Sequence, residues 1–577
     1  MTMLTKWGAV LDRSCPLPEY PRPQLRRESF YNLNGVWDYA VTPSGDEPEV
    51  WDGKIVVPFS PEAPLSGAAR GPAKDEYLHY RRGFTLPEGF QKSRVLLHFG
   101  AVDQIAEVFV NGVSAAKHSG GYWPFSADIT SLLREGENIL RVTVRDNADD
   151  PTFAYGKQRY KRGGMWYTAQ SGIWQTVWLE SVPEVYVKSL RITPEFDEAR
   201  VRIELETALE SSAAITCDVR AADGSFVAGS WAKGGVCIVP LPGFRAWTPD
   251  DPYLYTLDIT CGEDRVESYF AMRKFSYVEL DGRKVFGLNN APLFHNGLLD
   301  QGYYPDGLLT PPSDEAMVND IETMKRCGFN MLRKHIKIEP LRWYYHCDRL
   351  GMIVWQDMVS GGQPYSFLHV SALPTLGKVD FPDQDAKPYG RSGVLSRARF
   401  RREMADTVRL LYNCPCIALW TVFNEGWGQF DALDMANELK KLDPTRFIDH
   451  ASGWQDQGYE EMKSRHIYFR PVKLKNDGRA LALTEYGGYI LAVDGHRWTD
   501  KVFGYRICRD SAALAHDYEK LMLGQVLPHI RKEGLTAAVY TQITDVEEEL
   551  NGLMTYDREV LKIPEETLRE INKQLKF

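Results

Sequence analysis

The stretch ALWTVFNEGWGQF (418–430) begins as a run of bulky apolar residues and stops at Asn424 and Glu425. A second stretch, ALALTEYGGYI (480–490), breaks its apolar run in the same way at Glu485. Apolar runs of this length are typical of strands that are buried on both faces, where a carboxylate would be costly. We therefore predict two buried strands that each present a glutamate at the carboxyl end.

The pattern around these two stretches continues from residue 273 to residue 577. Apolar, strand-like runs alternate there with helical stretches, of which the clearest are 313–328 and 395–414. The eight strand candidates are residues 292–299, 329–335, 352–358, 417–425, 447–453, 464–469, 480–487 and 537–545. Eight strand–helix units in about 300 residues are the size of a TIM barrel. We therefore predict a (β/α)8 TIM barrel over residues 273–577.

The chain before this barrel reads as β structure. Short apolar or alternating runs stand between Gly, Asn and Asp, as in SRVLLHFG (93–100), IAEVFVNG (105–112) and NILRVTVRD (138–146). This pattern predicts a jelly-roll β-sandwich over residues 1–182. Strand-like runs at short spacing continue through residues 183–272, and that length is typical of an immunoglobulin-like β-sandwich. The sequence thus predicts a multidomain protein.

Residues 359–394, between the third and fourth barrel strands, are rich in Gly and Pro and show no period. A loop this long in a folded domain is usually functional or disordered. Because it follows a barrel strand, we expect it to lie over the mouth of the barrel.

The composition excludes several classes of function. The chain has 577 residues, a net charge of −10 and a pI near 5.8, which disfavours a dedicated nucleic-acid binder because such a protein needs a basic face. No window approaches 18 apolar residues, so we expect no membrane span. The nine cysteines are irregularly spaced, and the N-terminus lacks the apolar core of a signal peptide. We therefore expect free thiols and a cytoplasmic location.

The two glutamates point to one kind of chemistry. Chemistry in a TIM barrel takes place at the carboxyl ends of the strands, and the fourth and seventh strands face each other across the barrel. Glycoside cleavage needs two carboxyl groups, one to protonate the departing oxygen and one to attack or to activate water. Asn424, beside Glu425, can hydrogen-bond a sugar 2-hydroxyl. Either short motif alone is weak, so the hypothesis depends on their positions in the strand count.

With these motifs together, the chain resembles glycoside hydrolase family 2, which contains β-galactosidases, β-glucuronidases and β-mannosidases. The resemblance covers essentially the whole chain. The segments that carry it include SGIWQTVWLE (171–180), WTPDDPYLYTL (247–257), GFNMLRKH (328–335), CDRLGMIVWQDM (347–358), WTVFNEG (420–426) and LTEYGG (483–488).

The resemblance implies roles for individual residues. Glu425 is similar to the family's acid/base and Glu485 to its nucleophile. The family retains the anomeric configuration, which implies carboxyl groups about 5–5.5 Å apart. Arg333 matches the family's barrel arginine, whose fixed cation can hold Glu485 ionised and oriented.

This sequence also departs from the family pattern. His335 stands two residues after Arg333, closer than in many members, so its place in the pocket stays open. Tyr540 lies in the eighth strand where many members have a substrate-binding tryptophan, and we take it as a candidate for substrate contact. The acidic metal ligand that some β-galactosidases place near the NEG motif has no obvious counterpart, so we predict no obligatory metal and no cofactor. The Asn-x-Lys pair with which some β-glucuronidases hold a uronate is not evident.

Other candidates for the pocket follow the strands. Asp300 and Gln301 come after the first strand, Asp357 ends the third, Trp427 follows the acid/base candidate, and Tyr468 lies near the end of the sixth, where it could hydrogen-bond the nucleophile. For each of these, direct substrate contact and structural support both stay open.

The predicted function is a retaining exo-β-glycosidase that acts on a terminal sugar of a small glycoside or oligosaccharide, with a galactoside as the leading substrate. Glucuronide, mannoside, glucoside and arabinopyranoside remain as alternatives, because loop geometry and not motif spacing decides the sugar. Two other classes are a non-catalytic carbohydrate-binding protein and a barrel enzyme whose carboxylates hold a metal, which needs at least three converging ligands. Self-association is common in the family, but the sequence does not give a number of subunits.

Overall fold

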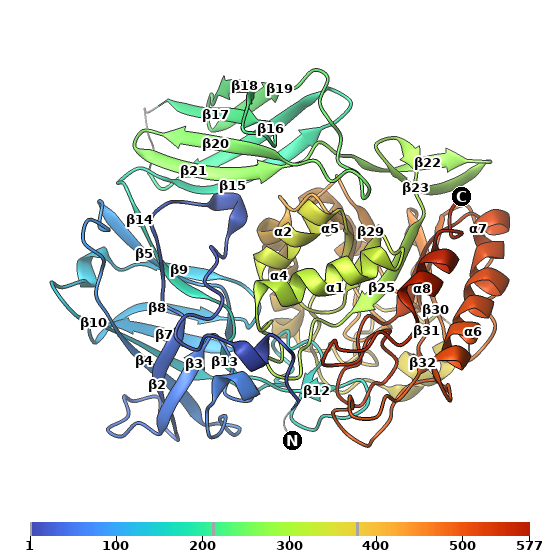
Figure 1. Ribbon diagram of the computed structural model, residues 1–577, viewed down its shortest axis with the longest axis horizontal. Helices are drawn as coiled ribbons and strands as arrows, with labels where there is room; N and C mark the ends of the chain where they lie inside the picture. Colours follow the sequence, from blue (N-terminus) through green and yellow to red (C-terminus); the bar gives the residue numbers. More distant parts are fainter. Residues whose placement is uncertain (1–2, 210–213, 377–379) are drawn as a thin grey trace.

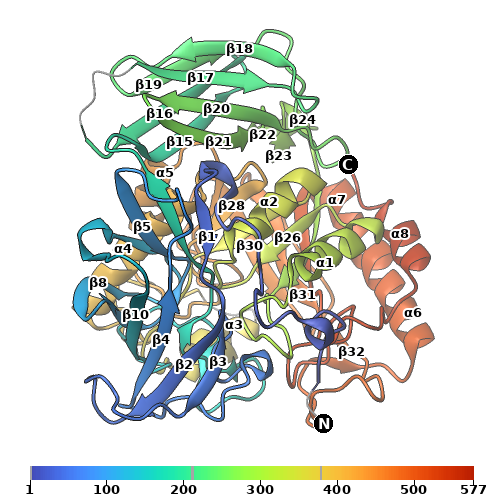
Figure 2. The same ribbon diagram turned by 60° about the vertical axis from the view of Figure 1, so that its left-hand side comes forward.

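Three bodies follow one another along the chain in the computed structural model, which describes residues 3–209, 214–376 and 380–577. The first, in blue and cyan, and the last, in yellow and red, lie side by side, and the green middle body lies across the top of both (Figure 1, Figure 2). The three match the predicted order of two β-sandwiches and a TIM barrel, so the predicted fold is confirmed.

The first body is a sandwich of two antiparallel sheets, and its core contains Trp37, Tyr80, Val108 and Leu179. The larger sheet consists, in spatial order, of β3 (Gly53–Val57), β2 (Gly35–Thr42), β4 (Tyr77–Phe84), β10 (Asn138–Arg145), β7 (Ile105–Val110) and β8 (Val113–Ser119). The smaller consists of β1 (Phe30–Asn32), β14 (Val177–Val182), β5 (Arg94–Phe99) and β9 (Phe125–Asp128). Two short pairs lie at one end: β6 (Val102–Asp103) with β13 (Gly172–Ile173), and β11 (Gln158–Arg159) with β12 (Tyr167–Thr168).

The middle body is a smaller sandwich. Alternate residues of its strands point inward, as in Tyr255, Leu257, Ile259 and Cys261. One sheet contains β15 (Val187–Glu195), β16 (Arg200–Thr207) and β19 (Val236–Pro240). The other contains β18 (Phe226–Trp231), β17 (Ile215–Arg220), β20 (Tyr255–Cys261) and β21 (Asp264–Phe270).

The last body is a parallel barrel of eight strands in the predicted order. The strands are β25 (His295–Asp300), β26 (Met331–Lys334), β27 (Ile353–Asp357), β28 (Ile417–Thr421), β29 (Phe447–Asp449), β30 (Met462–Ile467), β31 (Ala480–Gly487) and β34 (Leu535–Thr541). Strands β25 and β34 pair in parallel, which joins the first strand to the last. Between β29 and β30 the hydroxyl of Ser464 donates to Asp449 Oδ1 at 2.9 Å, and His466 N donates to Gly453 O at 3.3 Å. Side chains and loop backbone therefore complete the ring.

A hairpin covers the amino-terminal end of the barrel. It consists of β22 (Phe275–Leu280), β23 (Arg283–Leu288) and β24 (Ala291–Pro292). Phe286 from β23 stacks on Phe447 at 4.2 Å between ring centroids and lies edge-on to Trp355 at 5.9 Å. These apolar contacts close the amino-terminal end of the barrel. A site can therefore form at the opposite end, where the strands have their carboxyl ends.

Helices surround the barrel, except near its fifth and sixth strands. They are α1 (Asp314–Arg326), α2 (Leu341–Leu350), α3 (Leu373–Thr375), α4 (Val394–Leu411), α5 (Ala432–Leu442), α6 (Ser511–Leu521), α7 (Leu527–Glu533) and α8 (Glu565–Asn572). The predicted helices 313–328 and 395–414 are confirmed as α1 and α4. The hydroxyl of Ser313 accepts from Ala316 N at 3.2 Å and caps the start of α1. Residues 450–461 and 468–479, which follow β29 and β30, contain no helix.

The predicted mouth loop 359–394 contains a short helical segment, Leu368–Ala372 followed by α3, and three of its residues, 377–379, lie outside the described residues. The indole N–H of Trp454 donates to Val370 O at 2.8 Å, and Gln455 Nε2 donates to His369 O at 2.6 Å. These bonds join the loop to the segment that follows the fifth strand, at the carboxyl end of the barrel.

Two further expectations concern cysteines and membranes. All nine cysteines are free, and eight of them are buried. Among the helices of the described residues, none has the length and apolar character needed to cross a bilayer.

One buried ion pair supports the segment before β28. Arg446 is 2% exposed, pairs with Asp443 at 2.7 Å, and donates to the carbonyl oxygens of Tyr412, Cys414 and Ile417. We predict that Arg446→Met lowers the stability of the barrel by about 3–5 kcal/mol, because it leaves a buried carboxylate unpaired. Thermal unfolding should show a clear drop in Tm. Arg409→Met, on an exposed pair, is the control and should change Tm little. Equal Tm values for the two variants would contradict this account.

Candidate active site

The guanidinium of Arg333 lies inside the barrel with no exposed surface and binds groups from three strands or the turns after them. It donates twice to Asp357, from Nε to Oδ1 at 3.0 Å and from Nη2 to Oδ2 at 3.1 Å. Nη2 also donates to Asn424 Oδ1 at 2.8 Å, and Nη1 donates to Glu485 Oε1 at 3.1 Å and to Thr484 O at 3.1 Å. The predicted residues Arg333, Asp357, Asn424 and Glu485 are thus in one network.

Glu425 and Glu485 meet at a histidine that the sequence reasoning did not single out. His466 Nδ1 lies 2.8 Å from Glu425 Oε1 and 3.5 Å from Glu485 Oε2. One carboxylate oxygen of each glutamate and a ring nitrogen of His466 all lie within 4.8 Å of one another. The two carboxyl groups therefore face the same small volume.

The sequence predicts that Glu425 ends the fourth strand, but the structure places it beyond the strand. Strand β28 stops at Thr421, and Glu425 lies in the turn that follows, with a φ of 53°. Its backbone N–H donates to Ser452 O at 2.9 Å, and its carbonyl accepts from the indole of Trp454 at 2.9 Å. A non-glycine residue in the left-handed region is strained and needs such support. The turn aims the carboxyl group at His466.

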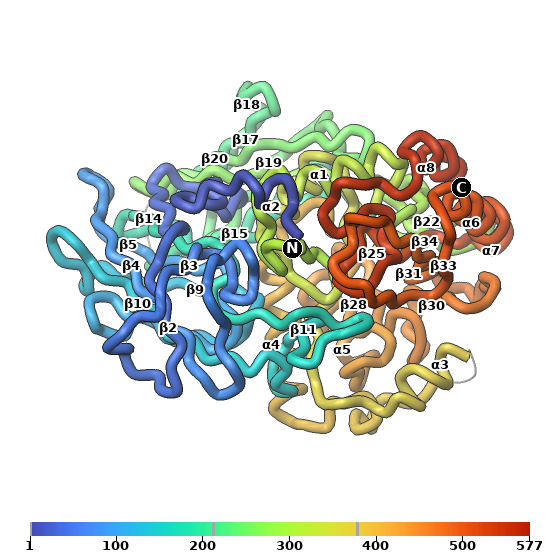
Figure 3. The backbone as a smooth tube through the Cα atoms, turned by 60° about the horizontal axis from the view of Figure 1, so that its bottom comes forward, coloured from blue at the N-terminus to red at the C-terminus, as the bar shows by residue number. Residues whose placement is uncertain are grey.

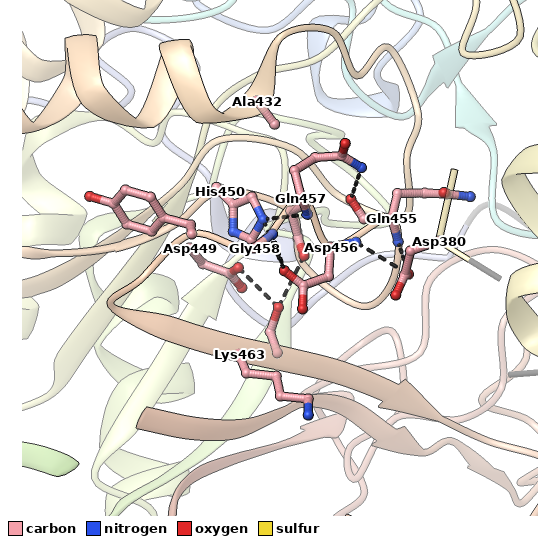
Figure 4. Close-up of polar contacts among 12 residues, drawn as sticks. Asp380, Ala432, Asp449, His450, Gln455, Asp456, Gln457, Gly458 and Lys463 are labelled. Atoms are coloured by element: carbon pink, nitrogen blue, oxygen red, sulfur yellow. Dashed lines mark hydrogen bonds and ion pairs between the residues drawn. The ribbon is translucent and has the colours of Figure 1, made fainter. Parts of the chain in front are cut away.

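The loop that supplies Ser452 and Trp454 is held by the contacts in Figure 4. Gln457 N donates to His450 Nε2 at 3.0 Å, and Gln455 N donates to Asp380 Oδ1 at 2.8 Å. Asp380 belongs to the mouth loop, so the two loops hold each other in place. The backbone of Glu425 is therefore supported from both.

The electrostatic surroundings of Glu425 favour its protonated form. Burial, the largest influence, raises the pKa of Glu425, and the cations Lys157 and Arg333 offset only part of the increase. Its side chain keeps 22% exposure, so solvent can reach it. Burial also lowers the pKa of His466 to about 3, so this imidazole is neutral near pH 7.

Asp357 and His335 form the next layer. His335 Nδ1 lies 2.8 Å from Asp357 Oδ2. Burial acts to raise the pKa of Asp357, but Arg333 and His335 outweigh it and lower that pKa to about 2. Asp357 is therefore ionised, and it binds both the guanidinium of Arg333 and the imidazole of His335. The structure brings His335 into the network through this carboxylate.

Tyr468 reaches the second glutamate, as the sequence suggested. Its hydroxyl donates to Glu485 Oε2 at 2.5 Å and lies 3.0 Å from Thr541 Oγ1. The ring of Tyr505 stacks on it with centroids 3.9 Å apart. Glu485 thus receives hydrogen bonds from Arg333 on one oxygen and from Tyr468 on the other.

Two predicted residues, Asp300 and Tyr540, point away from the two glutamates, and a third, Gln301, stays a prediction. Asp300 is in register with Lys334, and it accepts from Lys334 Nζ at 2.7 Å on the helix side of the sheet, where Lys334 also faces the ring of Trp343. Gln301 is buried, and no hydrogen bond among the described residues joins its side chain to the two glutamates. Tyr540 packs edge-on against Tyr518 of α6 at 5.2 Å, outside the barrel, and its neighbour Thr541 is the residue that faces the site. Strand alternation explains these misses, because adjacent residues point to opposite faces.

The sequence-based candidates did not include the contribution of the first sandwich. Trp427 packs against Trp166 and Tyr155, with ring centroids 5.0 and 5.7 Å apart. Residues 155–168 of the sandwich reach the barrel mouth, and Figure 3 shows the cyan tube around β11 running toward the red barrel loops. Gly164 N donates to Glu548 at 3.0 Å and Thr168 N to Glu547 at 2.9 Å. The sandwich therefore forms part of the wall of the site.

A signal for His466 was present in the sequence. The predicted sixth strand, SRHIYF (464–469), places this histidine near its end, next to the strand that carries Glu485. The pairing of β30 with β31 sets His466 opposite Glu485. The predicted pairing of these two neighbouring strands could therefore have identified His466 as a site residue. No comparable signal identified Lys157, because it comes from another domain.

The site contains a set of side chains that could hold a cation. Glu425, His466 and Glu485 offer three donor atoms of the kind that bind zinc or other divalent metals. His466 also lies within hydrogen-bond distance of Glu425 and 3.5 Å from Glu485, so the geometry is compatible with either use.

Comparison with known families gives the same assignment for all three bodies. Residues 63–183 match "Glycosyl hydrolases family 2, sugar binding domain", residues 185–273 match "Glycosyl hydrolases family 2", and residues 311–474 match "Glycosyl hydrolases family 2, TIM barrel domain". Together these matches cover more than half of the chain.

Individual relatives are distant. A β-galactosidase of Thermoanaerobacter pseudethanolicus is 25% identical over 64% of this chain, which spans only 47% of that relative. A β-glucuronidase of Paenibacillus borealis is 22% identical over 82% of this chain and 85% of its own length. A solved β-galacturonidase of Eisenbergiella tayi, bound to galacturonate, superposes with a TM-score of 0.71 at 19% identity, covering 96% of this chain and 99% of its own.

The chain spans about half the length, or less, of several β-galactosidases that it matches. The relatives include galactosidases and glucuronidases, so they agree on glycoside hydrolysis and differ on the sugar. The fold and the three family matches lead to one statement: the protein belongs to glycoside hydrolase family 2.

Proposed function

We propose that the protein is a retaining exo-β-glycosidase in which Glu485 is the nucleophile and Glu425 the acid/base. The observation that carries the proposal is the close approach of the two carboxyl groups, with oxygens within 4.8 Å, on either side of the neutral imidazole of His466. The distance matches the class of enzyme that forms a covalent intermediate.

In the first step Glu485 attacks the anomeric carbon while the bond to the leaving oxygen breaks. The proton on Glu425 goes to that oxygen, and the aglycone departs as an alcohol. Arg333 and Tyr468 hold the two oxygens of Glu485, so the attacking oxygen is oriented before substrate arrives. The buried setting of Glu425 keeps the acid protonated for this transfer.

In the second step Glu425, now ionised, takes a proton from water. The water oxygen attacks the anomeric carbon, the bond to Glu485 breaks, and the sugar leaves with its original configuration. His466 is a positioning residue in both steps, because it contacts one oxygen of each glutamate. Asn424, which is fixed by Arg333, is placed to bind the sugar 2-hydroxyl.

For the terminal sugar we propose a neutral hexose of the galactose type. The β-galactosidase relatives support it. The loop after the eighth strand also supports it, because residues 542–557 contain several acids and no Lys or Arg to hold a uronate. Glucosides, mannosides and arabinopyranosides share the required ring chemistry and belong in the same substrate panel. A small soluble glycoside as substrate and a cytoplasmic location remain predictions.

A metal-dependent hydrolase is the second candidate, since Glu425, His466 and Glu485 converge. The two candidates differ in their response to chelation. Hydrolysis of p-nitrophenyl β-glycosides that survives exhaustive treatment with EDTA supports double displacement. Loss of activity that Zn²⁺ or Mn²⁺ restores would contradict it.

We predict that Glu485→Gln lowers kcat for aryl β-glycosides on the order of 10⁴-fold or more, because the amide cannot form the glycosyl-enzyme. Mass spectrometry with a 2-fluoro glycoside should find the label on Glu485 in the wild-type protein. Glu519→Gln, an exposed acid on α6, is the matched control and should retain full activity. Unchanged hydrolysis by Glu485→Gln would favour a different nucleophile or a non-catalytic protein.

A second prediction concerns the acid. Glu425 must be protonated for the first step, so kcat/KM falls as the pH rises through its pKa, which burial places above the ordinary value of 4.5. Glu425→Ala should therefore abolish the alkaline limb of the profile. It should also slow substrates with poor leaving groups about 10²–10⁴-fold while sparing formation of the intermediate from 2,4-dinitrophenyl glycosides. An equal loss on both kinds of substrate, or an unchanged alkaline limb, would contradict the role. Glu460→Ala, at an exposed position, serves as control.

A further inference from the structure

One cation in the site comes from the first sandwich and has no bonded partner. Lys157 is 9% exposed, and no hydrogen bond or ion pair joins its ammonium group to another of the described residues. Its Nζ lies 5.5 Å from the ring centroid of Trp166. The residue is buried while its ammonium group stays open to solvent, so this group is free to bind a polar group of a ligand.

The backbone fixes Lys157 at the barrel mouth. Tyr155 N and Gly156 N both donate to Ser360 O, at 3.1 and 2.9 Å. Gly156 has a φ of 63°, and a Cβ there would lie 2.9 Å from Ile336 O. The chain therefore passes directly over the end of the second barrel strand, next to His335. Only glycine permits this approach.

Glu549 lies on the other side of the same wall. It is 4% exposed and follows the eighth strand. The hydroxyl of Tyr167 donates to Glu549 Oε2, and the backbone N–H of Tyr167 donates to Lys157 O at 2.9 Å. Tyr167 thus links the backbone of Lys157 to the carboxylate of Glu549.

Lys157 also influences the pKa of carboxyl groups at the barrel mouth. Burial, the largest influence, raises the pKa of Glu425 and of Glu549, and Lys157 is the strongest charge that opposes the increase for each. Glu485 in turn raises the pKa of Glu549. Among the residues that the structure describes, no ion pair joins Lys157 to Glu549, so the two charged groups are not in direct contact. A hydroxyl group that bridges an ammonium and a carboxylate makes one hydrogen bond of about 2.8 Å to each.

We propose that Lys157 and Glu549 select the terminal sugar by holding one of its hydroxyl groups between them, with the ammonium as donor and the carboxylate as acceptor. This proposal rests on the proposed glycosidase function and names the substrate class as a neutral sugar. The two charges cancel, so a neutral group fits without leaving charge unpaired. A uronate carboxylate would gain Lys157 but would face Glu549 and Glu485, and like charges in a buried site repel strongly.

The test compares matched neutral and acidic sugars. Hydrolysis is measured with p-nitrophenyl β-galactoside and β-galacturonide, and with the glucoside and glucuronide pair. We expect the wild-type protein to prefer the neutral member. Lys157→Met should lower kcat/KM for it about 10–100-fold without improving the uronide. Glu549→Gln should also weaken the neutral substrate, and it should shift the ratio toward the uronide at least about tenfold, because Lys157 then lacks its opposing charge.

Two variants serve as controls. Lys161→Met removes an exposed lysine from the same sandwich loop, and Glu559→Gln changes an exposed acid beyond the eighth strand. Both should leave the ratio within twofold of wild type. A structural role of Lys157 or Glu549 would lower both members of a pair alike, so an unchanged ratio in Glu549→Gln overturns the proposal. A wild-type preference for the uronide that Lys157→Met abolishes also overturns it, because the partner is then a substrate carboxylate.

Binding of free sugars separates this inference from the proposed reaction. Titration of galactose and galacturonate, monitored by protein NMR or calorimetry, needs no turnover. If no aryl glycoside is hydrolysed, the proposed function fails, while tighter binding of galactose than galacturonate, reversed in direction by Glu549→Gln, still supports the pair. Tighter binding of galacturonate to the wild-type protein overturns it.

Discussion

The buried guanidinium of Arg333 is the interaction on which the site depends. Taking this charge out of water is expensive, and the barrel compensates with two carboxylates, an amide oxygen and a backbone carbonyl supplied from around strands β27, β28 and β31. The fork geometry of arginine fixes these groups at set angles, which a lysine could not do. Glu485, Asn424 and Asp357 are therefore ordered before any substrate enters, and little reorganisation is left for the reaction.

The two glutamates have different surroundings although they share a histidine. Glu485 accepts hydrogen bonds from a cation and a phenol, whereas Glu425 contacts a neutral imidazole in a strained turn and keeps contact with solvent. Two equal side chains thus acquire unequal chemistry from their neighbours, and this difference is what a double displacement requires.

The sequence allowed the fold to be predicted because strand period, helix caps and strand count are local signals that agree with one another. It also identified Glu425, Glu485, Arg333, Asp357, Asn424 and Tyr468, which the structure brings together. Asp300 and Tyr540 were misplaced because strand alternation decides which of two adjacent residues points inward, and a boundary error of one residue reverses the choice. His466 was readable in principle from its position opposite Glu485. Lys157 was not, because its position depends on how a loop of one domain meets another, and sequence spacing does not record such contacts.

The loop of residues 155–168 shows that the barrel domain does not form the whole pocket by itself. This loop is hydrogen-bonded to Ser360, Glu547 and Glu548 of the barrel, while the strands within it belong to the sandwich. The two domains are consequently not interchangeable. Exchanging the sandwich for that of a relative would also replace part of the wall of the pocket. Divergence in this family can therefore alter specificity through substitutions in a domain that holds neither glutamate, and a survey confined to barrel residues would overlook them.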